Sequence, residues 1–126
     1  MVVGIGIDMV DIERLEGVLE RHPDRAADRL FNPTELADCA EKANPSECLA
    51  ARFAAKEAFL KALGTGLRDG IAWREISLRT DPHGRPHIEA SGAAAERVEA
   101  LGASSIHVSI THDGGLATAV VLLQTD

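Results

Sequence analysis

The sequence predicts an α+β fold with a mostly antiparallel sheet, one long central helix and several shorter helices. Three observations support this: a β-branched run opens the chain, an alanine-rich helical stretch occupies its middle, and two strand-like runs around a Gly-Gly pair close it. The order strand, helices, strands, helix and hairpin favours antiparallel pairing. With 126 residues, 45% of them hydrophobic, the chain fits a single domain, 1–126.

The N-terminal third predicts one strand and then short helices. VVGIGID reads as a buried strand that delivers Asp8 to the start of an amphipathic helix, VDIERLEGVLERH. Pro23 and Pro33 interrupt the stretch that follows, so we expect two short helices there, DRAADRLF and PTELADCAEKA.

The central helix is predicted to begin at NPSE, with Asn44 as N-cap and Glu47 in a variant capping box, and to stop at Gly64. Helical spacing places Lys56 inside its apolar stripe and Glu57 at the edge of that stripe, four residues before Lys61. The pair Glu57 and Lys61 alone is equally well explained as an ordinary exposed ion pair worth roughly 0.2–0.5 kcal/mol.

The C-terminal half predicts a sheet-rich region. AWREISLRT and RPHIEA read as two strands joined by the turn DPHG. SGAAAERVEALG reads as a helix capped by Ser91 and ended by Gly102. SIHVSITHDGGLATAVVLLQ predicts a hairpin that turns at Gly114 and Gly115.

Composition excludes several classes of function. A formal net charge of −7 argues against a nucleic-acid binder. Aromatic content of only 3% predicts an aliphatic core and makes oligomerisation plausible. Cys39 and Cys48 show neither a disulfide framework nor zinc spacing, so a reduced, cytoplasmic protein is expected. Asp8 interrupts the first apolar run too early for a signal peptide or a membrane span.

Two carboxylates and nearby cations suggest a metal-assisted phosphate site. Asp8 ends the first predicted strand, whereas Glu57 and Lys61 precede a glycine-bearing segment, GTG, that lets a ligand approach the backbone. A carboxylate 4 Å from a phosphate charge repels it by about 4 kcal/mol at an effective dielectric of 20. A divalent ion removes that conflict, and Mg²⁺ typically takes one or two carboxylates with phosphate oxygens and water.

Three motifs make the chain similar to a known family. GIGIDMVDIERLE, ARFAAKEAFLKALGTG and HVSITHD occur in the order and approximate spacing of the holo-acyl-carrier-protein synthases, the small 4′-phosphopantetheinyl transferases. The resemblance spans residues 4 to about 120. It implies the fold of that family and transfer of phosphopantetheine from coenzyme A to a serine of an apo acyl carrier protein, releasing adenosine 3′,5′-bisphosphate. It also implies Mg²⁺ and a homotrimer with active sites between subunits.

The resemblance also implies residue roles. Asp8 and Glu57 correspond to the metal carboxylates, and they form the catalytic group together with Lys61. Glu57, Asp113 or a metal-bound water are the alternatives for the general base, although Asp113 is more simply explained as the opening of a turn. The coenzyme-binding positions correspond to Arg52, Lys61, Gly64, Thr65, Gly66, Gly84, Arg85, Pro86 and His112.

Surface arginines are the candidates for carrier docking. Acyl carrier proteins are acidic, so an enzyme of charge −7 needs a local basic face to attract one. The family docks its carrier on the first helix, which favours Arg14 and Arg21, seven residues apart. Arg25 follows Pro23 and belongs to this group less directly.

Two other functions use similar residues. A metal-dependent coenzyme A or nucleotide diphosphate hydrolase would employ the same carboxylates with water as acceptor. A non-enzymatic coenzyme A-binding module would need the lysines and glycines but no carboxylate pair. Carriers of fatty-acid biosynthesis and of polyketide synthesis both fit, as do acylated forms of coenzyme A and other divalent metals.

Overall fold

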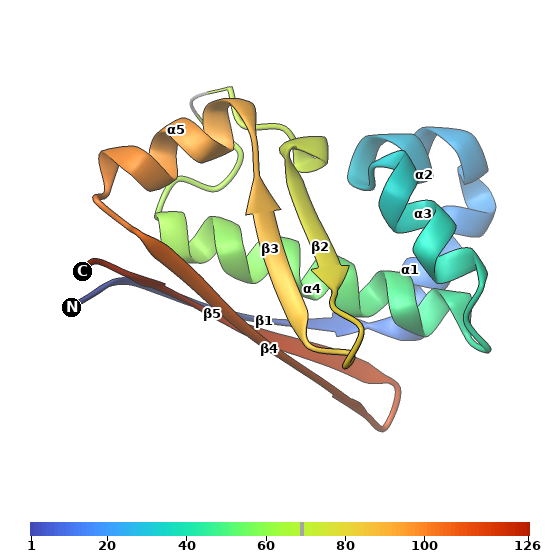
Figure 1. Cartoon of the computed structure of the whole chain (residues 1–126). Helices are drawn as coiled ribbons and strands as arrows, with labels where there is room; N and C mark the ends of the chain where they lie inside the picture. Colours follow the sequence, from blue (N-terminus) through green and yellow to red (C-terminus); the bar gives the residue numbers. More distant parts are fainter. Residues whose placement is uncertain (69) are drawn as a thin grey trace.

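The computed structural model describes residues 1–68 and 70–126. Its larger sheet has three antiparallel strands in the order β1 (Val2–Asp11), β5 (Leu116–Gln124) and β4 (Ser105–Asp113). A second antiparallel sheet pairs β2 (Ile76–Thr80) with β3 (Pro86–Ala90). The nineteen-residue helix α4 (Pro45–Leu63) runs along the larger sheet (Figure 1). The predicted α+β class with antiparallel pairing is confirmed, with the described strands divided between two sheets.

Shorter helices lie at the two ends of α4. Helices α1 (Ile12–Arg21), α2 (Pro23–Leu30) and α3 (Pro33–Ala40) gather at its N-terminal end, and α5 (Gly92–Ala100) lies at the other (Figure 1). The two proline breaks and the hairpin at Gly114 and Gly115 were predicted correctly. None of the described helices has the length and apolar character needed to cross a membrane.

Strand β1 and the segment before β2 differ from the prediction, α3 ends at Ala40, before the predicted EKA, and the Ser91 side chain makes no cap hydrogen bond to α5. β1 does not stop at Asp8 but continues to Asp11, whose side chain accepts a hydrogen bond from Arg14 N (3.0 Å) and so caps α1. Asp8 therefore lies within a strand, paired with Ala119 of β5. Trp73–Glu75 forms a 3₁₀ turn rather than the start of a strand, because the Glu75 side chain accepts a hydrogen bond from Ala72 N (2.8 Å).

Glycines let α4 lie directly on β1. A Cβ placed at Gly6 would stand 1.9 Å from Ala58 O, and one at Gly4 would stand 2.2 Å from Ala62 O. Any side chain at either position would collide with helix backbone, which cannot move as a flexible side chain can. The contact therefore requires glycine on the strand and small residues on the helix, and it fixes which helix residues meet β1.

A buried ion pair anchors the opposite face of α4. Lys56 is fully buried and pairs with the equally buried Glu35 of α3. Its Nζ also donates to the carbonyl oxygens of Leu30 (2.6 Å) and Trp73 (3.3 Å). Burial lowers the pKa of Lys56 and the Glu35 charge opposes that shift. Removing one member of such a pair leaves an uncompensated buried charge, so the pair fixes α4 relative to its neighbours.

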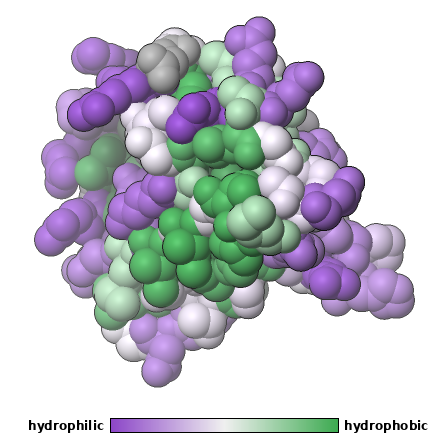
Figure 2. All heavy atoms as spheres, turned by 90° about the vertical axis from the view of Figure 1, so that its left-hand side faces the viewer, coloured by the Kyte–Doolittle hydropathy of each residue, from purple (hydrophilic) through white to green (hydrophobic). Residues whose placement is uncertain are grey.

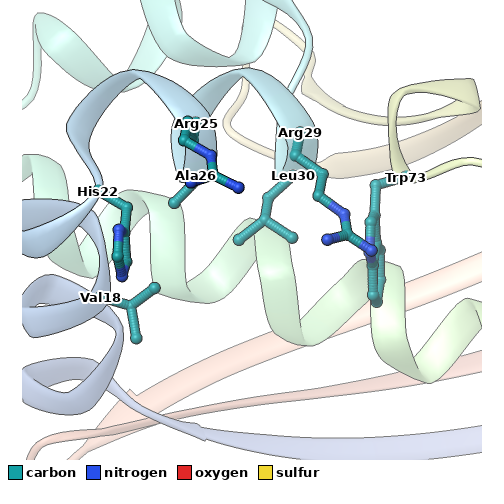
Figure 3. A pocket seen from close by; sticks show the side chains of 7 residues that line it. All are labelled: Val18, His22, Arg25, Ala26, Arg29, Leu30 and Trp73. Atoms are coloured by element: carbon teal, nitrogen blue, oxygen red, sulfur yellow. The ribbon is translucent and has the colours of Figure 1, made fainter.

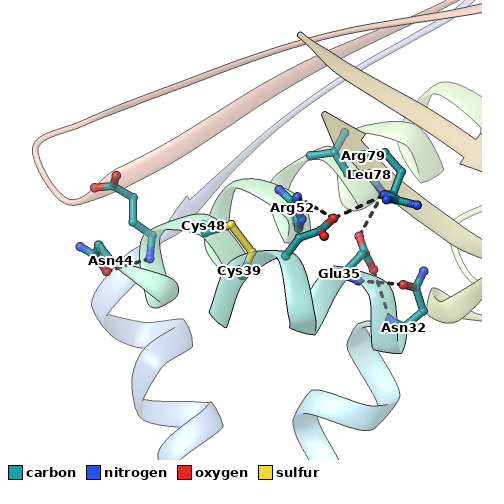
Figure 4. Close-up of a disulfide and its surroundings, with 10 residues drawn as sticks. Asn32, Glu35, Cys39, Asn44, Cys48, Arg52, Leu78 and Arg79 are labelled. Carbon is teal, nitrogen blue, oxygen red and sulfur yellow. Dashed lines mark hydrogen bonds and ion pairs between the residues drawn. A yellow bond between two sulfur atoms is a disulfide. The ribbon is translucent and has the colours of Figure 1, made fainter. Parts of the chain in front are cut away.

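The cysteines form a disulfide, so the prediction of reduced cysteines is wrong. Cys39 in the last turn of α3 and Cys48 in the first turn of α4 are bonded, with Cα atoms 5.5 Å apart (Figure 4). The chain folds back between the two helices, and sequence spacing alone does not reveal that the two side chains face each other. A loop of this length closed by a disulfide contributes about 2–3 kcal/mol through the entropy of the unfolded chain.

Candidate active site at the α4–β1 seam

Asp8, Glu57 and Lys61 meet where α4 crosses β1. Lys61 Nζ donates to Asp8 Oδ1 (2.8 Å) and to the backbone oxygen of Ile7 (3.0 Å). The hydrogen bond that Lys61 donates to Asp8 is the largest cause of a raised pKa for Lys61, which stays cationic. Glu57, one helical turn earlier, lies beside Asp8. The structure therefore brings together the three side chains that the sequence proposed as a catalytic group.

The two carboxyl groups are held close enough to compete for a proton. The pKa of Glu57 rises from 4.5 to about 7, first because it is partly buried and then because the neighbouring Asp8 carboxylate favours its protonated form. Lys61 acts in the opposite direction. Near neutral pH, Glu57 of the metal-free protein therefore carries a proton part of the time.

The carboxylates of Asp8 and Glu57 fit a divalent cation whose remaining ligands are phosphate oxygens and water. Among the described residues, Asp8 Oδ2 is buried and has no hydrogen-bond partner, so one carboxylate oxygen is already desolvated and unsatisfied. The described chain contains no cluster of three or more His, Cys, Asp or Glu that could hold a metal ion. Two carboxylates with the remaining positions left to phosphate and water is the arrangement typical of Mg²⁺ rather than of a closed protein site.

A cavity of about 650 Å³ opens beside Lys61 at the C-terminal end of α4. We refer to it as the Lys61 cavity. Gly64 and Gly66 have φ values of 80° and 61°, so the chain reverses there without a side chain in the way. Arg68, which the sequence reading did not select, adds a second cation near Lys61. The lining residues are Leu60, Lys61, Gly64, Thr65, Gly66, Leu67 and Arg68.

A separate cavity of about 490 Å³, which we call the His112 cavity, is lined by residues that include Arg52, Gly84, Pro86 and His112. His112 Nε2 lies 3.4 Å from Glu47 Oε1 at the start of α4. His112 is exposed near the end of β4 and does not lie in the core.

Two predicted coenzyme-binding residues fit the His112 cavity less simply. Arg52 is only 4% exposed and is directed to Asp38, 3.6 Å away. Arg85 is exposed and does not line the cavity; its backbone N–H donates to Asp81 Oδ1 (2.9 Å). Lys42, a cation that sequence reasoning missed, does line it.

Within one chain, the Lys61 cavity and the His112 cavity are separate. Glu47, the partner of His112, and Lys61 are fourteen residues apart on α4, which corresponds to about 21 Å along the helix axis. The coenzyme-binding residues proposed from the sequence therefore fall into two groups at opposite ends of one helix.

The proposed docking arginines border a groove that reaches Glu57. Arg14 and Glu57 line one cavity of about 310 Å³, and Arg25 lines a neighbouring cavity of about 330 Å³. Val18 and Leu30 line both, so the two cavities adjoin. Figure 3 shows Arg29 beside Trp73, the only tryptophan in the chain, with Arg25 further along the same cavity. Sequence reasoning did not identify Trp73. Arg21 is exposed at the end of α1 and lines neither cavity.

Comparison with known proteins decides the family. A model of the 4′-phosphopantetheinyl transferase superfamily matches residues 4–121. The chain belongs to this superfamily. It is 49% identical over 124 residues to the holo-[acyl-carrier-protein] synthase of Trichlorobacter lovleyi, covering 98% of each chain. The predicted family and its class of transferase activity are confirmed.

Solved structures of superfamily members agree with this fold. The holo-[acyl-carrier-protein] synthase of Neisseria meningitidis has a TM-score of 0.91 at 33% identity, covering 99% of this chain and all of that one. The Helicobacter pylori enzyme, solved in complex with coenzyme A, has a TM-score of 0.83 at 34% identity and covers 95% of this chain and 99% of its own.

The raised pKa of Glu57 gives a titration prediction for the metal-free protein. We expect its side-chain carboxyl ¹³C resonance to titrate near pH 7 and the Asp8→Asn variant to titrate lower, though above 4.5, because burial remains. A carboxyl group whose pKa is higher in the folded state destabilises the fold as pH rises, here between 4.5 and 7. Asp113→Asn is the control and leaves the titration of Glu57 unchanged. A Glu57 that titrates near 4.5 in the native protein contradicts the pairing.

Proposed function

We propose that this chain transfers 4′-phosphopantetheine from coenzyme A to a serine of an apo acyl carrier protein. The serine oxygen attacks the phosphorus that bears the pantetheine, the bond between that phosphorus and the bridging oxygen breaks, and adenosine 3′,5′-bisphosphate leaves. The observation that carries this proposal is the group Asp8, Glu57 and Lys61 at one seam in a member of this superfamily. The whole chain would act as one domain around a single hydrophobic core.

Each residue of the seam has a role suited to its position. Lys61, cationic and 57% exposed at its side chain, would offset charge on the diphosphate. Glu57, which lines the cavity below Arg14, would accept the serine proton. Asp8 and Glu57 would hold Mg²⁺, which supplies charge neutralisation at the diphosphate when bound. Asp113 lies at the hairpin end and is exposed, which favours a role in the turn over a role as base.

The donor would be shared between two copies of the chain. The Lys61 cavity would take the diphosphate, and the His112 cavity of a neighbouring copy would take the adenosine end with its 3′-phosphate. The separation of these cavities along α4 supports such an interfacial site, because one chain carries both cavities but holds them about 21 Å apart along the helix. The three-copy arrangement itself follows from the family resemblance.

An exposed apolar stripe supports self-association. Ile5, Ile7 and Met9 of β1 are each at least 60% exposed. They pair with Leu122, Val120 and Thr118 of β5, so one face of the larger sheet is mostly apolar. Figure 2 shows apolar atoms gathered on the side of the molecule where the two termini lie. Such surfaces mark interaction sites in soluble proteins, and we place the homotrimer contact on this sheet.

The acidic carrier would enter along the groove that begins at the arginines. Arg14 shares a cavity with Glu57, so a carrier held there has its serine near the reaction centre. Arg25 and Arg29 extend the basic rim, and Trp73 with Leu30 supplies apolar surface below it. We propose a cytoplasmic enzyme that serves carriers of fatty-acid or polyketide synthesis.

Transfer can be tested directly by mass spectrometry. With apo carrier, coenzyme A and Mg²⁺, we expect the carrier to gain one phosphopantetheine and one adenosine 3′,5′-bisphosphate to appear per carrier modified. Asp8→Asn and Glu57→Gln should each lower turnover by about 10²-fold or more, the scale of a lost catalytic acid or base. Glu89→Gln, an exposed carboxylate on β3, is the control. Loss of coenzyme A without carrier would indicate a hydrolase, and binding without turnover a coenzyme A-binding module.

The docking proposal predicts a salt-dependent defect. Arg14→Glu with Arg21→Glu should lower kcat/KM for the carrier and leave the KM for coenzyme A nearly unchanged, because the two substrates use different surfaces. Stopped-flow binding should place most of the loss in the association rate, and the loss should shrink as salt rises. The Arg14→Lys with Arg21→Lys variant keeps the charge and should retain most carrier activity. A defect that ignores salt would move the docking site elsewhere.

A further inference from the structure

The disulfide is part of the wall of the His112 cavity. Cys39 is 1% exposed, whereas Cys48 is half-buried and lines the cavity together with His112 and Arg52. Figure 4 shows the bond crossing from α3 to α4 beside Arg52. These are the only two cysteines of the chain.

The bond fixes a segment that forms much of the cavity rim. The connection between α3 and α4 contains Lys42, Ala43 and Asn44, which are exposed and line the cavity. Asn44 Oδ1 accepts a hydrogen bond from Glu47 N (3.1 Å), and Glu47 in turn contacts His112. The position of His112's partner therefore depends on how the first turn of α4 is held.

The other side of the bond holds a pair of arginines. Asp38, next to Cys39, lies 3.6 Å from Arg52 Nη2 and 3.4 Å from Arg79 Nε. Within the described structure, these buried nitrogens have no hydrogen bond, so ionic contact with Asp38 is what positions them. The spacing of α3 and α4 thus sets both the position of Arg52 in the cavity wall and the cavity rim.

We propose that Cys39 and Cys48 form a redox modification site whose reactant is a dithiol, and that the bonded state shapes the His112 cavity for a nucleoside bisphosphate. The second half rests on the proposed function, which assigns the adenosine end of the donor to this cavity. Disulfides in reducing compartments are usually transient or redox-sensing rather than structural.

The exchange is balanced with a dithiol as the two-electron reductant. A thiolate of the dithiol attacks Cys48 Sγ, the sulfur nearer the cavity, and Cys39 leaves as a thiolate that takes a proton. The second thiol then attacks the mixed disulfide and releases Cys48. The dithiol ends as a disulfide, the protein ends with two thiols, and an oxidised dithiol reverses the process.

The effect should fall on binding rather than on the chemical step. Cys48 and Glu57 are nine residues apart on α4, about 13 Å along the axis. Asp8 and Lys61 contact neither α3 nor the segment beside the disulfide in any described hydrogen bond. Loosening the α3–α4 connection therefore leaves the seam of Asp8, Glu57 and Lys61 in place.

Calorimetry with adenosine 3′,5′-bisphosphate tests this proposal, since that probe carries no thiol and cannot itself open the disulfide. Alkylation followed by mass measurement counts free thiols in each sample. We expect no free thiols after oxidation, two after dithiothreitol, and a dissociation constant about fivefold or more higher in the reduced form. The Cys39→Ser with Cys48→Ser variant should bind weakly with or without dithiothreitol, and circular dichroism checks its folding.

The possible failures are distinguishable. Two free thiols after treatment with an oxidised dithiol would overturn the modification site. Equal, measurable affinity in the oxidised and reduced native protein would overturn the coupling while leaving the donor cavity in place. Absence of binding in both forms, with the disulfide opening and closing normally, would overturn the coupling through failure of the donor-site assignment in the proposed function.

Discussion

The close approach of α4 to β1 is the constraint on which the rest of the structure depends. Gly4 and Gly6 leave no side chain between strand and helix, and the carbonyl oxygens of Ala58 and Ala62 occupy the space that a Cβ would need. At this distance Lys61 reaches both the backbone of β1 and Asp8. The same contact sets Glu57 beside Asp8, so the geometry of the proposed metal site follows from two missing side chains.

Contacts on the other faces of α4 hold the helix rigidly against β1, and each end of the helix borders a cavity. Lys56 and Glu35 tie the middle of the helix to α3, to the end of α2 and to the 3₁₀ turn. Their charges are too deeply buried to separate without large loss of stability. The C-terminal end borders the Lys61 cavity at Gly64. The N-terminal end carries Glu47, which contacts His112 of β4. One helix therefore carries both cavities, which suits the proposed assembly in which neighbouring copies complete each other.

Much of the fold could be predicted because local signals marked its boundaries. Asn44, Pro45 and Gly64 bound α4 where the sequence indicated, and Gly114 with Gly115 turns the final hairpin. The predicted end of β1 at Asp8 was wrong, because a charged residue indicates the end of a strand when its ion-pair partner is unknown. The partner, Lys61, is 53 residues away in sequence. Long-range pairing of this kind has no periodic signal.

The site shows the same division between local and long-range information. The residues of the seam were named from motifs, and their proximity is a property of the fold. The disulfide, the division into two cavities and the position of Trp73 in one cavity with Arg25 and Arg29 depend on how α2, α3 and the 3₁₀ turn pack against α4. None of these contacts is marked by a spacing of residues in the sequence. The spacing of Cys39 and Cys48, for example, fits reduced cysteines as well as a disulfide.

The most direct test of this account is the stability of Gly6→Ala in denaturant, compared with Gly17→Ala. A Cβ at Gly6 meets helix backbone, so we expect Gly6→Ala to lose about 1–3 kcal/mol or more of unfolding free energy. Gly17 lies within α1, where a Cβ would meet only the flexible end of Arg21 at 3.3 Å, so Gly17→Ala should be neutral or gain about 0.4–1 kcal/mol. A Gly6→Ala protein as stable as the native one would contradict the close contact of α4 with β1, and with it the origin proposed for the site.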